Sequence, residues 1–434
     1  MTAASPAPHN DAKPSVQRPR TGRAPRLLGV DLARFVAVFG MFVIHFGAPF
    51  SGGAVELALA GACSGRATAL FTFLAGVSLA MLTGRRTPLT GQKLRDARKR
   101  IAVRAVLLVL IGLLLATCTD ATGFLLTVII PFYGAYFLLA LPFVGMRARG
   151  LAISAVLMVA LGPQVSYLLR AAVTEGSPVA MMVEAVNSID PGHLIGDLGV
   201  LDLLLLDFYP ATSYLALVLA GLAVGRLDLR SGAVRLRLAL GGAGLAALTY
   251  TVSALLAGRL PDVLMEGTVP VGHPEFLLAA RAHSGSSFEL LGSLGVAVAV
   301  LAGCLELADR AGRAVSPLVK AGSMALTLYA LHALVMAWQV VVGGWPLSGV
   351  PETLANLASM GQDVSGIPDF PAFPPDGHRP VGFVAFLNMY MPELFLLFSI
   401  GFAVLWKQFF RRGPLEGAVS SAVDAFMART TRSA

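Results

Sequence analysis

The chain has 434 residues, of which 56% are hydrophobic and only 13% are charged, and its mean hydropathy is +0.73. Because ordinary soluble proteins carry about 25% charged residues, this composition excludes a soluble globular protein. A net charge of +8 would suit a nucleic-acid-binding protein, but the placement of the basic residues along the chain argues against that class.

Most of the apolar residues lie in runs of about 20, the length of helix that crosses the hydrocarbon core of a bilayer. Residues 1–26 precede the first run, are rich in Pro, Ala and basic residues, and are expected to form a disordered basic tail. The chain is therefore predicted to be an all-α integral membrane protein, with a multi-pass domain over 27–406 and a C-terminal tail over 407–434. The ten predicted transmembrane helices are 27–50, 66–84, 101–119, 122–146, 150–169, 209–226, 236–257, 288–308, 321–344 and 382–406.

The basic residues are distributed unequally between alternate loops. With the N-terminus inside, 27 of the 33 Lys and Arg lie in the tails and inner loops, and only five lie in outer loops. This asymmetry predicts that both termini are cytoplasmic. The loop Arg85–Arg104, which carries eight Lys and Arg, is by the same rule a determinant of topology rather than a nucleic-acid site. The five exceptions are Arg66, Arg170, Arg259, Arg281 and Arg379.

Three of the predicted outer segments are long: 170–208, 258–287 and 345–381. In the first, residues 179–186 and 198–206 are apolar enough to lie on the membrane surface or to dip into it. The last is rich in Pro and Gly and is expected to be irregular.

The first predicted helix carries three ionisable residues, Asp31, Arg34 and His45. The residues from Arg34 to His45 turn the helix about 20° beyond three full turns, so both side chains project from one face, about 16 Å apart along the axis. Asp31 lies on the same face, three residues before Arg34, and can pair with it. Since ionisable groups are costly inside a bilayer, this stripe is a candidate functional site.

Two interpretations of the stripe stay open on the residues alone. In the structural one, Asp31 and Arg34 form an ion pair near the inner interface, and His45 is a polar residue at the outer one. In the functional one, Arg34 binds a negatively charged or carbonyl-bearing donor, while His45 acts as a general base on an acceptor. Histidine suits that task because its ordinary pKa lies near neutrality.

An Arg followed after ten residues by His in the first membrane helix is similar to the pattern of membrane-bound acyltransferases. The wider stretch RLLGVDLARFVAVFGMFVIH (26–45) resembles the bacterial members of the heparan-alpha-glucosaminide N-acetyltransferase family. Four further stretches resemble the same family in order: GRATALFTFLAGVSLA (65–80), YPATSYLALVLAGLAVGR (209–226), HSGSSFELLGSLGVA (283–297) and AGSMALTLYALHALVM (321–336). The resemblance covers most of residues 26–336.

This resemblance implies a multi-pass transmembrane acyltransferase. Members of the family transfer an acyl group, usually acetyl, from acyl-CoA on one side of the membrane to an amine or hydroxyl of a sugar on the other. It further implies His45 as catalytic base, with Arg34 and Asp31 as donor-site or pore residues; transfer could be direct or pass through an acyl-histidine. The Ala, Gly and Arg usage indicates a bacterial protein of the plasma membrane, which argues against heparan sulfate as acceptor.

A polar run before the eighth predicted helix holds further candidates for substrate binding, His283, Ser284 and Glu289. His283 is expected outside, at about the level of His45, where it could complete the acceptor site with Glu289 orienting it. The alternative is that the run only caps the helix, with Ser286 or Ser287 as the N-cap and Glu289 in the first turn.

Arg66, Tyr209 and His332 are the remaining candidates for substrate binding. Arg66 breaks the positive-inside pattern, so it either binds an acidic ligand or pairs with an outer acid. His332 is expected near the bilayer midplane, where a buried imidazole needs a partner such as Thr327 or Tyr329. Tyr209 leads into the sixth helix together with Asp207 and Asp202, and these residues either contact a hydroxylated acceptor or are only a solvated acidic stretch.

The sequence contains no Gly-rich phosphate loop and neither a His-x-x-Glu-His nor a paired Cys motif, so neither a nucleotide-driven motor nor a metal site is expected. The rival hypothesis is a proton-coupled transporter or exporter whose pathway uses Asp31, Arg34 and His332, although no internal repeat is evident. The expected partners are an acetyl-CoA co-substrate as acyl donor, a glycoconjugate acceptor and the lipid bilayer, without nucleic acid. A homodimer is a further hypothesis.

Overall fold

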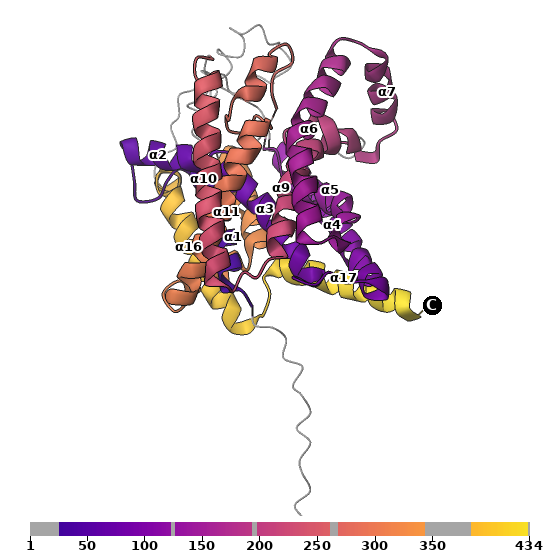
Figure 1. The fold of residues 1–434 in the computed structure, drawn as a ribbon. Helices are drawn as coiled ribbons and strands as arrows, with labels where there is room; N and C mark the ends of the chain where they lie inside the picture. Colours follow the sequence, from indigo (N-terminus) through magenta and orange to yellow (C-terminus); the bar gives the residue numbers. More distant parts are fainter. Residues whose placement is uncertain (1–25, 123–125, 193–197, 261–267, 343–382, 433–434) are drawn as a thin grey trace, which may run out of the picture.

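The computed structural model describes residues 26–122, 126–192, 198–260, 268–342 and 383–432. Throughout these ranges the regular secondary structure is helical. Seven helices are long and apolar enough to cross a membrane, and a bent pair would add an eighth crossing (Figure 1). The prediction of an all-α integral membrane protein is therefore confirmed. The predicted N-terminal tail, apart from Arg26, and the predicted irregular segment 345–381 lie outside the described residues.

Each of the ten predicted segments contains a helix. The long helices are α1 (Leu28–Phe46), α4 (Gly91–Asp120), α6 (Ala148–Thr174), α10 (Gly232–Ala257), α11 (Ser287–Arg310), α16 (Met391–Phe409), and α3 (Arg66–Leu82), which continues the short helix α2 (Gly53–Cys63). Two segments hold apolar helices of only 11 and 15 residues, α5 (Ile130–Ala140) and α9 (Ala211–Gly225). The segment 321–344 holds α13 (Ala325–Val341), which forms a bent pair with the short helix α12 (Ser316–Gly322) before it.

Two predicted helices are shorter than expected because of proline. The segment 122–146 contains α5 alone, followed by the 3₁₀ turn η1 (Phe143–Gly145): Pro131 lies in the first turn of α5, and Pro142 follows its end. The segment 382–406 is divided into α15 (Phe383–Met389) and α16, which has Pro392 in its first turn. Proline is favourable in the first turn of a helix but interrupts a helix that has already begun, so each of these prolines marks a helix boundary.

The predicted helix 321–344 begins too early: residues 321–322 end α12, and α13 follows after a bend of 75°. The start of α13 is held by α17 (Pro414–Arg432), a helix in the predicted C-terminal tail. Glu416 of α17 accepts hydrogen bonds from the backbone N–H groups of Leu326 and Thr327 and from the Thr327 hydroxyl. A carboxylate there satisfies the unpaired N–H groups of a new helix, which stabilises the break.

Of the two apolar stretches expected on or in the membrane surface, one is exposed and the other packs into the bundle. The first forms α7 (Pro178–Asn187), where Met181 and Met182 are 71% and 69% exposed. The second contains a short π-helical turn, η2 (Asp202–Leu206), which contacts α5, α6 and α9 and buries Leu203. This second stretch is thus part of the bundle.

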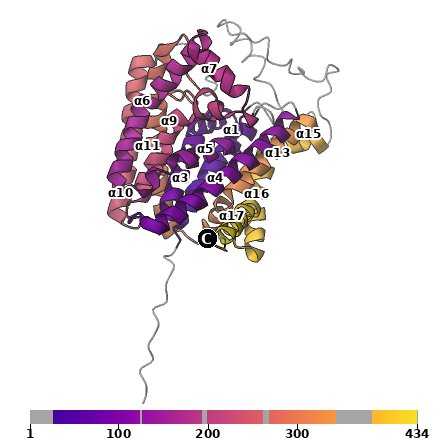
Figure 2. The same ribbon diagram turned by 90° about the vertical axis from the view of Figure 1, so that its right-hand side faces the viewer.

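Successive long helices run in alternating directions, so the loops gather at two ends of the bundle (Figures 1 and 2). The turns that follow α3, α9 and α11 lie at one end, together with α17. We call this end the basic face, because Arg85, Arg226, Arg310 and Arg412 lie there. The opposite face carries α2 and α7.

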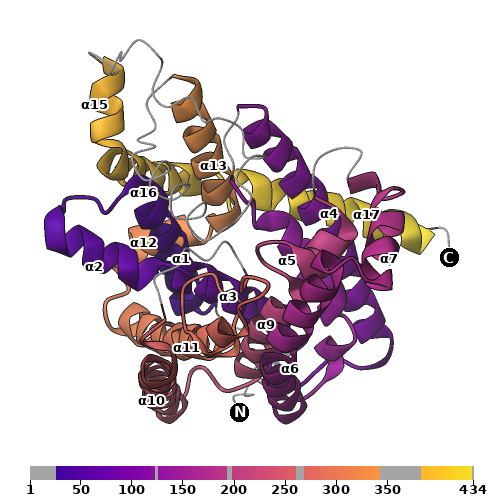
Figure 3. The same ribbon diagram turned by 90° about the horizontal axis from the view of Figure 1, so that it is seen from above.

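The centre of the bundle is formed by α1, α3 and α9, around which the other helices are arranged (Figure 3). Nearly all of α9 is buried. It crosses α3 where Gly76 faces the Val218 carbonyl and Gly221 faces the Phe73 carbonyl, and a Cβ at either glycine would collide with that backbone. Small residues let two membrane helices approach this closely, which fixes the position of α3 relative to α9.

Arg226, at the end of α9, holds the basic face together. It is 4% exposed, and its guanidinium donates to the carbonyls of Ala80, Thr83, Arg85 and Val144 and to the Thr83 hydroxyl. These acceptors belong to the end of α3, the turn after it and η1. One guanidinium therefore links the end of α3, the turn after it and η1 through their carbonyl groups.

We expect Arg226→Met to destabilise the protein by about 2–3 kcal/mol, because it removes all of these hydrogen bonds from the buried end of α3 and from η1. The measurement is the melting temperature of detergent-purified protein. Arg259→Met is the matched control, since Arg259 is exposed and a surface substitution changes stability by no more than about 0.5 kcal/mol. Equal melting temperatures for the two variants would contradict the assigned role.

Candidate active site

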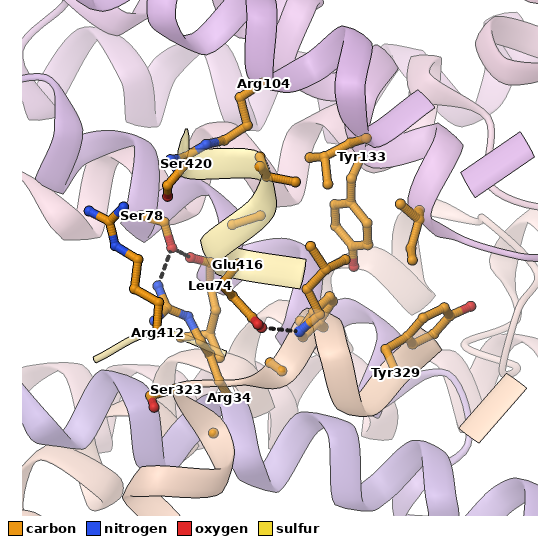
Figure 4. Close-up of a pocket in the computed structure, with 18 of the residues that line it drawn as sticks. Arg34, Leu74, Ser78, Arg104, Tyr133, Ser323, Tyr329, Arg412, Glu416 and Ser420 are labelled. Atoms are coloured by element: carbon orange, nitrogen blue, oxygen red, sulfur yellow. Dashed lines mark hydrogen bonds between the residues drawn. The ribbon is translucent and has the colours of Figure 1, made fainter. Parts of the chain in front are cut away.

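A cavity of about 420 Å³ lies inside the bundle next to the basic face; we call it the basic cavity. Its charged lining residues are Arg26, Arg34, Arg104, Lys407, Arg411, Arg412 and Glu416. Figure 4 shows Arg34, Arg104 and Arg412 toward one end, and Tyr133 and Tyr329 toward the other. The cavity therefore suits a ligand that is anionic at one end and uncharged at the other.

The predicted pair of Asp31 and Arg34 is confirmed at the wall of this cavity. Arg34 Nη1 donates to Asp31 Oδ1 at 2.7 Å, and Arg34 Nη2 donates to the Ser78 hydroxyl at 2.7 Å. Asp31 is 1% exposed and forms a second ion pair with Arg26 at 2.6 Å. A neighbouring hollow of about 380 Å³ shares Arg26 with the basic cavity and is also lined by Asp31 and Lys320. Asp31 thus orients Arg26 and Arg34, which line adjoining cavities.

A second, smaller cavity of about 200 Å³ is lined by His45 and His283, and we call it the histidine cavity. His45 comes from the last turn of α1, and His283 from the loop before α11. Tyr209 also lines it, with its hydroxyl 3.5 Å from His283 Nδ1. Three of the predicted site residues therefore face one space.

His45 is hydrogen-bonded to His332 of α13, Nδ1 to Nε2, at 2.9 Å. The other nitrogen of His332, Nδ1, lies 2.7 Å from the Tyr329 carbonyl oxygen. A carbonyl can only accept, so His332 Nδ1 carries a hydrogen. His332 is fully buried, and Phe42 and Phe46 lie beside it, surroundings that favour a neutral imidazole.

The tautomer of His45 follows from this chain. A neutral His332 with a hydrogen on Nδ1 has a lone pair on Nε2, so it accepts the hydrogen bond and His45 Nδ1 donates it. We therefore assign the lone pair of His45 to its Nε2. An imidazole nitrogen without a hydrogen, on a ring that lines a cavity, is the form that a general base requires.

The loop that carries His283 is held by Glu289. The Glu289 carboxylate accepts from the backbone N–H of His283 at 2.9 Å and of Gly285 at 2.7 Å. His283 has a φ of +61°, a strained conformation for a residue with a side chain. Burial lowers the pKa of His283 to about 4, so its ring is neutral at pH 7. This loop therefore presents an uncharged imidazole to the histidine cavity.

Helix capping, the alternative for this polar run, is also present. Ser286 is the N-cap of α11, and its hydroxyl accepts from the Glu289 N–H at 3.0 Å. Ser284 is buried and its hydroxyl is bonded within the loop. Ser284 and Glu289 thus shape the loop and do not line the histidine cavity.

Arg66 lines neither cavity, although its chain neighbours Gly65 and Ala67 line the histidine cavity. Its Nε donates to the Tyr250 hydroxyl at 2.9 Å, its guanidinium lies 4.8 Å from the Tyr250 ring centre, and Nη1 donates to the Gly61 carbonyl. These contacts join α3 to α10 and α2. Across the described residues, no group of three or more His, Cys, Asp or Glu is placed to hold a metal ion.

Sequence reasoning missed several residues of these cavities. Arg104 and Arg412, which line the basic cavity, were grouped with the topology determinants or the tail. Of the partners expected for His332, Thr327 and Tyr329, the structure confirms Tyr329 through its carbonyl, whereas the second partner, His45, was not expected. The one available signal for that pairing was the presence of both histidines in predicted membrane helices.

Fold and cavities together define a multi-pass membrane protein with a cation-lined cavity near one face and a histidine-lined cavity farther along the same helices. Residues 26–253 match the family described as heparan-alpha-glucosaminide N-acetyltransferase, catalytic. The match covers more than half of the chain, and the protein belongs to this family of transmembrane acetyltransferases. No curated protein matches the chain. Arg34, His45 and Tyr209 lie within the matched region, whereas His283 and His332 lie beyond it.

Proposed function

We propose that this protein transfers an acetyl group from acetyl-CoA, bound at the basic face, to an amine or hydroxyl of a sugar or glycoconjugate that enters the histidine cavity. The observation that carries the proposal is the hydrogen-bond chain from the Tyr329 carbonyl through His332 to His45. It leaves His45 Nε2 as a proton acceptor on a ring that lines a cavity of the size of a small substrate group.

The basic cavity fits the donor in charge and in shape. Acetyl-CoA has phosphate groups at one end and an uncharged thioester at the other. Arg104 and Arg412 would bind the phosphates, because arginine forms bidentate bonds with them. The pantetheine arm would then extend past Leu74 toward Tyr133 and Tyr329, at the opposite end of the cavity. Arg34, already fixed by Asp31 and Ser78, would lie beside the arm.

The chemistry is a nucleophilic acyl substitution. His45 Nε2 removes a proton from the acceptor as its nitrogen or oxygen attacks the thioester carbon; the C–S bond then breaks and the CoA sulfur leaves as thiolate. The resulting imidazolium donates from Nδ1 to His332, which stabilises its charge. His45 then returns the proton from Nε2 to the sulfur. We favour this direct route over an acyl-histidine intermediate, since the donor in the basic cavity and the acceptor in the histidine cavity would approach each other from opposite faces.

The direction of transfer follows from the charge of the loops. The basic face would lie in the cytoplasm of a bacterial cell, since the positive-inside pattern assigns basic loops to that side. Acetyl-CoA is made in the cytoplasm, so it would reach the basic cavity directly. The acceptor would approach from the opposite face, toward His283 and Tyr209.

The first test is binding of the donor. Because a ligand that binds the native state stabilises it by about 2.7 kcal/mol at 100 times its dissociation constant, acetyl-CoA should raise the melting temperature of detergent-purified protein. Desulfo-CoA separates recognition of the nucleotide from recognition of the acyl thioester. Arg104→Gln with Arg412→Gln should reduce the shift, while Arg259→Gln on the opposite face should not.

The second test is transfer in sealed vesicles of known orientation that contain cell-envelope glycans. Radiolabelled acetyl-CoA supplied at the basic face should label glycans on the other side. If acetyl-CoA causes no melting shift and no glycan is labelled, the proposal is refuted. That result would favour a transporter that uses Asp31, Arg34 and His332.

A further inference from the structure

Tyr329 lies at the junction of the two cavities. Among the described residues that line them, it is the one residue shared by the basic cavity and the histidine cavity. It lies in the second turn of α13, just after the bend, and its ring packs edge-on against His332 at 5.0 Å. A group that passes from the basic cavity toward His45 must therefore come beside Tyr329.

The Tyr329 hydroxyl is fixed by one hydrogen bond and keeps a second one available. Its oxygen accepts from the backbone N–H of Ile129 at 3.1 Å. Ile129 is the N-cap of α5, so this N–H belongs to the positive end of a helix. A phenol that accepts in this way still has its own O–H to donate, and none of the described residues accepts it.

The neighbouring tyrosines differ in this respect. The Tyr133 hydroxyl pairs with Thr72 at 2.9 Å, and the Tyr136 hydroxyl donates to the Tyr209 carbonyl at 2.7 Å. In Figure 4 the hydroxyl of Tyr329 points away from the arginines. Tyr329 therefore offers a donor at the end of the basic cavity that is farthest from its cations.

We infer that the Tyr329 hydroxyl donates a hydrogen bond to the carbonyl oxygen of the thioester and stabilises the negative charge that develops there. This inference rests on the proposed function. When the acceptor forms its new bond to the thioester carbon, the π electrons of the C=O bond move to oxygen. When they return, the C–S bond breaks and CoA leaves as thiolate. Tyr329 keeps its proton throughout, while the proton of the acceptor goes to His45 Nε2.

This role explains why Tyr329 and His45 line the same small cavity. The base must reach the attacking atom and the donor must reach the carbonyl oxygen, both within hydrogen-bond distance of one carbon centre. The N–H of Ile129 strengthens the donor, since a hydroxyl that accepts a hydrogen bond becomes a better donor itself. Tyr329 is only 3% exposed, and a fixed donor has a larger effect in buried surroundings than in water.

The test is Tyr329→Phe, which keeps the ring between the cavities and removes only the hydroxyl. We expect kcat for acetyl transfer to fall about 10²-fold, with KM and the acetyl-CoA melting shift changed by less than about 2-fold. The control is Tyr167→Phe, a buried tyrosine of α6 that lines neither cavity. A kcat within about 2-fold of wild type, or a loss explained by weaker donor binding, would overturn the inference.

A second readout needs no acceptor. In the infrared difference spectrum of bound acetyl-CoA labelled with ¹³C at the carbonyl, a hydrogen bond lowers the stretching frequency. We expect the band of the wild type to lie below that of Tyr329→Phe. Equal bands in protein that binds acetyl-CoA refute the role of Tyr329 and leave the proposed function standing. Wild-type protein that neither binds nor transfers refutes both.

Discussion

Replacing His45 with Ala should lower acetyl transfer by about 10⁴-fold, the upper end of the range for loss of a general base. The reason is geometric: two nitrogens of the His45–His332 pair carry no hydrogen, and since His332 Nε2 accepts from His45, only His45 Nε2 keeps its lone pair for a substrate. The measurement is the initial rate of label transfer from acetyl-CoA at saturating donor, in vesicles that hold equal amounts of each protein.

The same variant should still bind the donor. His45 lines the histidine cavity and not the basic cavity, so the acetyl-CoA melting shift of His45→Ala should match that of wild type. His273→Ala is the control, because His273 is exposed and pairs with the exposed Glu275. Full transfer by His45→Ala would eliminate the general-base mechanism, and loss of the melting shift would indicate a folding defect instead.

The first helix could be predicted well from the sequence, because its contacts are local. The spacing of three residues between Asp31 and Arg34 places both on one face, and they pair in the structure. The helical period also places His45 on that face. Yet Arg34 and His45 reach different cavities, since about 16 Å of helix separates them and Tyr329 of α13 stands between the two spaces.

The pairing of His45 with His332 could not be predicted, because 287 residues separate them in the chain. A sequence pattern shows that each lies in an apolar helix, but it does not show which helices touch. Arg104 and Arg412 were missed for the same reason. Each has the pattern of a loop cation near a membrane, and only the packing of α17 against α4 brings Arg104 of α4 and Arg412, in the turn before α17, to one cavity.

The short helices illustrate a further limit. The prediction of ten crossings assumed that each apolar segment must match the thickness of a bilayer. That requirement holds for helices that face lipid. Helix α9 is surrounded by protein, and the bend between α12 and α13 is capped by Glu416, so both can depart from it. Burial by other helices cannot be deduced from hydropathy.

The role of His332 as a hydrogen-bond acceptor for His45 can be tested with two replacements, one that cannot accept that bond and one that can. His332→Met should lower kcat about 10³-fold, because it fills the space but gives His45 Nδ1 no acceptor, so that the tautomer and orientation of His45 are lost. His332→Gln places an amide oxygen near the position of Nε2, and should recover activity to within about 10-fold of wild type.

This pair of variants distinguishes positioning from packing. If His332 served only to fill space among Phe42 and Phe46, the Met and Gln variants would lose activity according to stability, and the polar Gln would be the more damaged. If it fixes the tautomer, the less stable Gln variant should be the more active one. The two melting temperatures and the two values of kcat, measured on the same preparations, therefore decide between a structural histidine and one that prepares His45 to accept a proton.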